Sequence, residues 1–262
     1  QLYANASTSS PYFINYTGLS DGIYYYNATT YDSAGNSNST TARNITIDTT
    51  NPLIDLASPY TQTGNYTQTY IEANISVTEI NLANITIYLY NTTGLVNSNT
   101  STSSPHFVNF TSLPDGTYYL NATTYDNAGN YNSTATQTII LDNVAPTVTQ
   151  VSPGNNTLES SSNTVILIYN VTDATSEIIN CSLYINDVFN EVDTSITKDI
   201  NQSFTKTLSG GQYNWSITCF DSVEFSTSTG NYNLTIDVSA PTTTLNSPVN
   251  GYNSSSTSMM FN

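Results

Sequence analysis

The sequence predicts an all-β protein built of tandem β-sandwich domains. Three observations support this fold class. A block of about 94 residues recurs along the chain, apolar and polar residues alternate within short segments, and turn-forming residues separate those segments. No segment shows the 3.6-residue period of an amphipathic helix. The 262 residues therefore correspond to about three units of sandwich size.

The repeat is clearest where residues 113–130 reproduce residues 19–36 almost unchanged. A more divergent third copy begins at Leu208. Self-similarity at a fixed period determines architecture before any local motif does.

The repeat divides the chain into four expected segments. Residues 1–51 are predicted to be an incomplete domain that lacks its first strands. Residues 52–145 and 146–240 are predicted to be complete domains, and residues 241–262 to be the first strands of a further domain. These ends could complete each other between adjacent subunits, or they could be an arbitrary cut through a longer chain, which we favour.

In the first segment, residues 24–31 are dense in Tyr and Thr and are predicted to form one strand. Residues 32–36 have the Asp, Gly and Asn content of a turn. Residues 44–48 are the expected last strand, with Ile45 and Ile47 facing inward.

In the second segment, residues 71–77 and 85–89 alternate strictly between aliphatic and polar side chains, as half-buried strands do. The third segment repeats this pattern over residues 165–171, 181–185 and 213–219. The facing of Phe204 is left open, because it falls where the second segment has Asn109.

Composition limits the partners of this chain. Only three residues are basic, and the net charge is −16, so nucleic acid is not expected as a partner. The segment has no apolar run long enough to cross a bilayer, so direct membrane insertion is not expected within it.

Three motifs carry a family resemblance. They are Leu-x-Asp-Gly-x-Tyr at 113–118, Tyr-Asp-x-Ala-Gly-Asn at 125–130 and Ile-x-Ile-Asp-x-x-x-Pro at 45–52. Together they resemble tandem immunoglobulin-like repeats of prokaryotic cell-surface glycoproteins, of the bacterial adhesin or archaeal surface-layer type. The resemblance implies immunoglobulin-like β-sandwich domains arranged as an extended rod. It also implies that Tyr24, Tyr118 and Tyr213 are tyrosine corners, although three ordinary core tyrosines are the alternative.

Asparagine is abundant and often begins an Asn-x-Ser/Thr sequon. The number of sequons is about twice that expected by chance from the Ser and Thr content. On predicted strands many of them lie opposite the apolar face, where a glycan needs to be. We therefore expect N-glycosylation, and the alternative is a polar surface that solubilises without charge. The 20 sequon asparagines are Asn5, Asn15, Asn27, Asn38, Asn44, Asn65, Asn74, Asn84, Asn91, Asn99, Asn109, Asn121, Asn132, Asn155, Asn170, Asn180, Asn201, Asn214, Asn233 and Asn253.

The two cysteines, Cys181 and Cys219, both face inward by alternation, on strands expected to be neighbours. In an exported chain of low charge they are expected to form a disulfide, and two buried free thiols are the alternative.

No catalytic residue and no cofactor-binding residue is assigned. His106 is the only histidine, and no metal-ligand spacing is present. Acidic residues cluster at turns such as the one at Asp126, and calcium at domain junctions is considered but not favoured over turn-capping acids. No cofactor is expected apart from covalent N-glycans.

These features together predict a non-enzymatic, N-glycosylated structural protein that is extracellular or at the cell surface. It would be a rod, a surface-layer element or a filament subunit. Self-association into a filament or lattice is the expected partnership, with a host or neighbouring-cell surface as a further candidate. The alternatives are an adhesin or glycan-binding array, for which the third segment with Trp215 is the candidate, and a spacer of a larger secreted enzyme.

Overall fold

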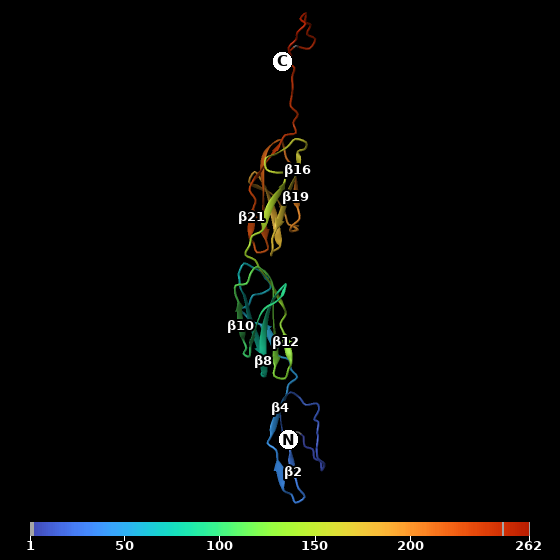
Figure 1. Ribbon diagram of the computed structural model, residues 1–262, viewed down its shortest axis with the longest axis vertical. Coiled ribbons are helices and arrows are strands. Elements are labelled where there is room, and N and C mark those ends of the chain that lie inside the picture. The colour runs from blue at the N-terminus through green and yellow to red at the C-terminus, as the bar shows by residue number, and fades with distance from the viewer. Residues whose placement is uncertain (1–2, 248, 262) are drawn as a thin grey trace. The chain divides into compact units, whose positions relative to one another are not determined.

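The computed structural model describes residues 3–247 and 249–261, so the predicted outer limits of the first and last segments, residues 1 and 262, lie outside it. The described residues contain strands, turns and loops, and no helix is present among them (Figure 1). The all-β fold class is therefore confirmed. The chain divides into two compact units, the first ending at Asp142 and the second beginning at Asn143.

The N-terminal part of the first unit forms two small antiparallel sheets. One sheet pairs β1 (Gly22–Tyr26) with β4 (Arg43–Ile47), and the other pairs β2 (Thr29–Tyr31) with β3 (Ser37–Ser39). The prediction of one continuous strand over residues 24–31 is therefore wrong, because the strand is broken between β1 and β2.

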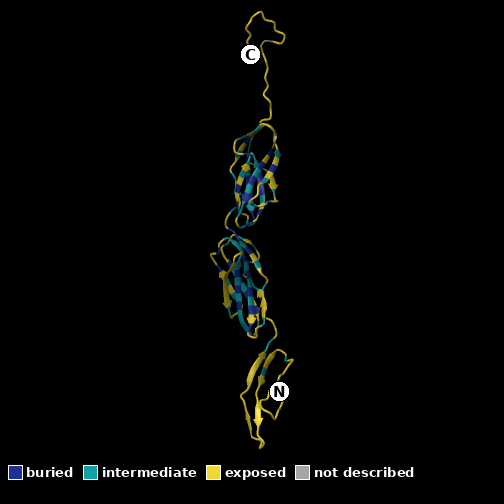
Figure 2. Ribbon diagram, turned by 45° about the vertical axis from the view of Figure 1, so that its right-hand side comes forward, coloured by how far each residue is buried: buried dark blue, intermediate teal, exposed yellow. Residues whose placement is uncertain are grey.

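The break has a physical cause. The equivalent strand later in the unit runs without interruption because it pairs along one whole edge with a long neighbour, whereas β1 pairs only with β4. Both faces of this small sheet are open, and Figure 2 shows the segment almost entirely in the colour of exposed residues. Ile45, expected to face inward, is 50% exposed.

The first sandwich follows in the same unit, and its strands lie within residues 53–141. Its smaller sheet has three strands, β10 (His106–Phe110), β7 (Ile71–Thr78) and β5 (Leu53–Leu56). Its larger sheet has the order β6 (Gly64–Tyr66), β13 (Gln137–Leu141), β11 (Gly116–Asp126), β8 (Leu82–Asn91) and β9 (Gly94–Ser101), with β12 (Tyr131–Ser133) paired to β11.

The core of the first sandwich lies between these sheets. Alternate residues of β7, β8 and β11 are fully or almost fully buried, as in Ile71, Ile87 and Leu120. Burying one such side chain stabilises the fold by about 1.5–3 kcal/mol. The residues between them, such as Thr86, point to the solvent side, so the period-two pattern read from the sequence sets the facing of each strand.

The second sandwich, in the second unit, has the same strand order. Its smaller sheet contains β14 (Thr147–Ser152), β16 (Thr164–Thr172) and β19 (Gln202–Thr207). Its larger sheet has the order β15 (Thr157–Glu159), β22 (Tyr232–Ile236), β20 (Gly211–Asp221), β17 (Ile178–Ile185) and β18 (Val188–Asp193), with β21 (Ser226–Ser228) paired to β20.

The core of the second sandwich contains larger aromatic side chains. Phe204, whose facing the sequence left open, is buried and stacks on Tyr169 with ring centroids 5.5 Å apart. Trp215 is also buried and makes an edge contact with Tyr232. The strands expected after Pro241 are not formed in the described residues, since 241–247 and 249–261 contain turns and loops only.

Candidate functional site

The sequon asparagines are distributed over both units, and none of them is buried. The exposed ones are Asn5, Asn15, Asn27, Asn38, Asn44, Asn65, Asn99, Asn109, Asn132, Asn155, Asn201, Asn233 and Asn253. The half-exposed ones are Asn74, Asn84, Asn91, Asn121, Asn170, Asn180 and Asn214.

Strand geometry places many of these asparagines on the outer faces of the sandwiches. On β8, Asn84 precedes the fully buried Ile85, and on β7, Asn74 lies between the fully buried Ala73 and Ile75. Each Asn therefore shares the solvent side with its own Ser or Thr two residues on. A modifying enzyme needs both side chains accessible, and this arrangement provides them.

The carboxamide groups of the sequons differ in how they are held. The Asn132 Nδ2 donates a hydrogen bond to the Pro52 carbonyl at 3.1 Å, and the Asn74 Nδ2 donates to the Ser58 carbonyl at 3.1 Å. The Oδ1 atom of Asn91 instead accepts hydrogen bonds from its own turn, including the Gly94 amide at 3.1 Å. Attachment of a sugar replaces one hydrogen of Nδ2, so the second hydrogen remains for such contacts.

The two cysteines form a disulfide inside the second sandwich. Cys181 on β17 and Cys219 on β20 are directly opposite in the sheet register, and their Cα atoms are 4.0 Å apart. Both residues are fully buried beside the aliphatic side chains of the core. The bond closes a separation of 38 residues between adjacent strands of one sheet.

The three tyrosines assigned as corners make the same local contact. The Tyr24 hydroxyl donates to the Ser20 carbonyl at 2.8 Å, and the Tyr118 hydroxyl donates to the Pro114 carbonyl at 2.8 Å. The Tyr213 hydroxyl likewise donates to the carbonyl four residues upstream, at 3.1 Å. Each bond connects the start of a strand to the segment just before it, as a tyrosine corner does.

A fourth tyrosine makes this contact and was missed by the sequence reasoning. The Tyr66 hydroxyl donates to the Gln62 carbonyl at 3.2 Å. The sequence pattern that could have identified it is Gly-x-Tyr, since Gly64 stands two residues before Tyr66 as Gly116 stands two residues before Tyr118.

The hydroxyl of Tyr118 has a raised pKa. Burial is the main cause, and the negative charge of Asp115 has a smaller effect in the same direction.

The turn aspartates bind their own backbone. Asp32, Asp126 and Asp221 each accept hydrogen bonds at Oδ1 from the amides two and four residues on, at 2.8 to 3.0 Å. At Asp126, burial raises the pKa, but hydrogen bonds from the Asn130 side chain and from backbone amides outweigh it, so the pKa lies below its usual value. At Asp32 the Asn36 side chain is the largest cause of a lowered pKa.

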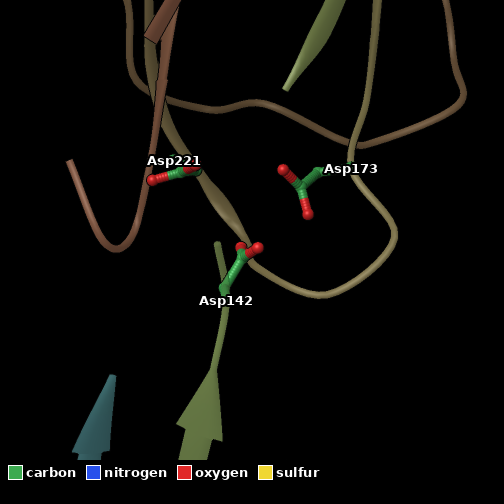
Figure 3. Close-up of side chains that lie close together, drawn as sticks. All are labelled: Asp142, Asp173 and Asp221. Carbon is green, nitrogen blue, oxygen red and sulfur yellow. The ribbon is translucent and has the colours of Figure 1, made fainter. Parts of the chain in front are cut away.

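Two aspartates of the second unit lie close together. Carboxylate oxygens of Asp173 and Asp221 are within 4.8 Å of each other, and Figure 3 draws both, together with Asp142 of the first unit. Oδ1 of Asp173 accepts hydrogen bonds from the Thr175 and Ser176 amides, each at 2.8 Å. Calcium takes six to eight oxygen ligands. Asp173 and Asp221 offer two carboxylate groups toward such a set.

Both lysines are engaged within the second unit. The Lys198 ammonium group donates to the Ser176 carbonyl at 2.7 Å and lies 3.4 Å from a Glu177 carboxylate oxygen. Lys206 forms an ion pair with Glu191.

Among the residues that the structure describes, we find no helix with the length and apolar character needed to cross a membrane.

Comparison with known families identifies two matches. Residues 15–49 and 64–143 match a family described as a bacterial Ig-like domain. Residues 104–191 match a second family described as a bacterial Ig-like domain of group 3. No curated protein matches this chain.

Several solved structures are similar in fold. One shows fibronectin(III)-like modules of CbhA from Clostridium thermocellum, at 15% identity over 71% of this chain and 94% of that chain, with a TM-score of 0.34. A bacterial ice-binding adhesin of 1.5 MDa is similar at 16% identity over 76% of this chain and 69% of that chain, with a TM-score of 0.35. The amphioxus IgVJ-C2 molecule is similar at 13% identity over 65% of this chain and 99% of that chain, with a TM-score of 0.38.

Proposed function

The chain contains tandem bacterial Ig-like repeats, and we propose that it is an N-glycosylated structural segment of a cell-surface or extracellular protein. Domains of this kind are typical of surface proteins and adhesins and are generally non-catalytic. The observation that carries the proposal is the arrangement of the sequons. Rows of sequon asparagines line the outer faces of strands whose alternate residues form the core, as Asn84 and Ile85 do on β8.

The proposed role is mechanical. Short junctions at residues 49–52, 143–146 and 238–241 each end in proline and leave little linker freedom, which favours an extended rod. In the first junction, the Asn81 Nδ2 donates to Asp48 Oδ2 at 2.9 Å, and the Asn130 Nδ2 donates to the Asp48 carbonyl at 3.1 Å. These contacts link two turns of the first sandwich to the end of the preceding segment.

Glycans would coat the outer faces and replace charge as the source of solubility. Only 8% of the residues are charged, which is low for a protein surface. Sugars would also cover sheet edges, which otherwise invite pairing with other strands. We further propose self-association into a filament or lattice. Electron microscopy of native material tests this step, because a filament or lattice is expected and isolated rods alone would contradict it.

The adhesin or glycan-binding alternative pointed to the third segment, with its distinct loop at residues 222–226 and with Trp215, which lies in the second sandwich. Trp215 is 1% exposed and packs in the core, so its ring does not face a ligand. The structural role is therefore favoured over binding at this residue.

The proposal is tested by the intact mass of the chain purified from its native cell surface. A mass that falls on chemical deglycosylation, with glycopeptides that map to this chain, is expected. Recovery from the cytoplasm with a mass that deglycosylation does not change would contradict both the glycosylation and the location.

A further inference from the structure

Aromatic residues precede sequon asparagines more often than composition accounts for. Aromatic residues make up 11% of the chain, so roughly two of the 20 sequons would have one at the second position before Asn by chance. Five do, and two of them recur one repeat later: Tyr3 before Asn5, Phe13 before Asn15 with its copy Phe107 before Asn109, and Tyr25 before Asn27 with its copy Tyr119 before Asn121. Residues two apart on a strand share a face, so the ring lies beside its sequon where both residues are in one strand, as for Phe107 and Asn109 on β10 and for Tyr119 and Asn121 on β11.

The sheet register brings further aromatic rings next to sequons. Directly opposite residues on antiparallel strands have Cβ atoms about 4.5–5.5 Å apart. Six sequon asparagines have an aromatic residue in that position: Asn44 opposite Tyr25, Asn74 opposite Phe107, Asn84 opposite Tyr125, Asn91 opposite the buried Tyr118, Asn121 opposite Tyr88 and Asn180 opposite Phe220. This register is not readable from the sequence and is an independent observation.

The two patterns converge at Asn121 on β11. Tyr119 precedes it on the same face, and Tyr88 of β8 lies directly opposite. Tyr90 lies opposite Tyr119, and the rings of Tyr88 and Tyr90 are stacked with centroids 6.0 Å apart and planes 25° apart. All three rings are half-exposed. We call Tyr88, Tyr90 and Tyr119 the tyrosine platform.

We propose that the tyrosine platform binds the first sugar ring of an N-glycan attached to Asn121. The inference rests on the proposed function, because it needs a sugar at this residue. A pyranose ring has an apolar C–H face, and the face of a tyrosine ring is apolar with a negative quadrupole. Stacking removes both faces from water, so it stabilises the folded, glycosylated state.

The side-chain amide of Asn121 is compatible with this arrangement. Its Nδ2 donates a hydrogen bond to the Thr136 Oγ1 at 3.2 Å. Glycosylation replaces one hydrogen of Nδ2 and leaves the other for Thr136. The amide is thus anchored to the solvent face while the sugar extends over the neighbouring rings.

Elsewhere one ring serves two sequons. Phe107, 49% exposed, precedes Asn109 on β10 and lies opposite Asn74 of β7. Tyr25 of β1 likewise lies opposite Asn44 of β4 and is two residues before Asn27 in the sequence. Aromatic side chains that would otherwise be exposed thus become contact surfaces for the glycan coat.

The direct test uses the full chain secreted from a eukaryotic host and trimmed to one N-acetylglucosamine per site. Nuclear magnetic resonance is expected to show upfield ring-current shifts of the sugar protons at Asn121 and contacts to the Tyr119 ring. Both are expected to disappear in Tyr119→Thr/Tyr88→Thr, which keeps strand-forming side chains on the outer face. Asn233 is the matched control, since neither Asn231, two residues before it, nor Asn214, opposite it on β20, is aromatic, and its sugar should resonate at ordinary positions in all variants.

A thermodynamic cycle gives a second readout. Tyr119→Thr should raise the unfolding equilibrium constant about two- to tenfold more when Asn121 carries the sugar than in the Asn121→Gln background. The same cycle in unglycosylated protein from a bacterial host should show no coupling. Glycopeptide mass spectrometry establishes occupancy in each variant.

Several outcomes would overturn the inference. Unshifted sugar protons at an occupied Asn121, an absence of coupling, or an empty Asn121 beside an occupied Asn233 would each do so. A native chain without sugar at any site would overturn the proposed function instead and would leave the resonance result in the recombinant chain unaffected.

Discussion

Cys181 of β17 and Cys219 of β20 face each other across adjacent strands of one sheet, and their sulfur atoms are bonded. Antibody domains place their disulfide between the two sheets of the sandwich, whereas this bond crosslinks two neighbours in the same sheet. Its role is therefore to fix strand pairing in the second sandwich, in a chain whose first sandwich contains no cysteine.

Removal of the disulfide should destabilise the second sandwich selectively. Closing a 38-residue separation stabilises by about 3–4 kcal/mol in the chain-entropy account, so Cys181→Ala/Cys219→Ala should lose about this amount. Urea unfolding followed through Trp215 fluorescence measures it, since that residue reports on the second sandwich alone. An unchanged midpoint would contradict the prediction, and an unchanged unfolding transition of the first sandwich is the internal control.

Loss of a tyrosine hydroxyl should weaken a corner without disturbing the core. Tyr118→Phe removes the bond to the Pro114 carbonyl and should cost about 0.5–1.5 kcal/mol. The control is Tyr125→Phe on the same strand, whose ring is 42% exposed and which should stay close to the parent chain. Equal effects of the two substitutions in chemical denaturation would argue against a specific corner bond.

Stability should fall in acid because of the turn aspartates. The folded-state pKa of Asp126 lies below the unfolded value of about 3.9, so its contribution is present above that pH and is lost as the pH falls through the folded pKa. Denaturant midpoints between pH 7 and pH 2 should therefore be level at first and drop below about pH 4. Asp126→Asn should show a smaller drop, and an equally steep drop would exclude this residue as a contributor.

Neighbouring positions on β8 should lose very different amounts of stability on truncation. Ile87 is fully buried, so Ile87→Ala should cost about 2–5 kcal/mol. Thr86 lies on the outer face, where its hydroxyl is 3.0 Å from that of Thr100, so Thr86→Ala should cost at most about 1 kcal/mol. Thermal unfolding of both variants measures the difference, and comparable losses would show that the strand faces were assigned wrongly.

Much of this fold could be predicted because its signals are local. Strict alternation around Ile75 and Ile87 gives the facing of the strands directly. Inward positions on strands expected to be neighbours were enough to predict the pairing of Cys181 with Cys219, which the structure contains. The turn at Asp126 is likewise encoded by its own Asp, Gly and Asn residues.

Features that depend on distant partners could not be read this way. The short strand β6 pairs in parallel with β13, residues distant in sequence, and no local pattern specifies that register. The facing of Phe204 was unresolved because the divergent third copy is one residue out of step with the second. The positions of Tyr88 opposite Asn121 and of Phe107 opposite Asn74 likewise emerge only from the paired strands.

The central claim is that the outward rows of asparagines carry carbohydrate. Site-resolved glycopeptide analysis of the chain taken from its native surface tests it most directly. The account predicts sugar on outward strand positions such as Asn84, Asn121 and Asn233. Unmodified asparagine at all of these positions, in protein recovered from the cell surface, would contradict it.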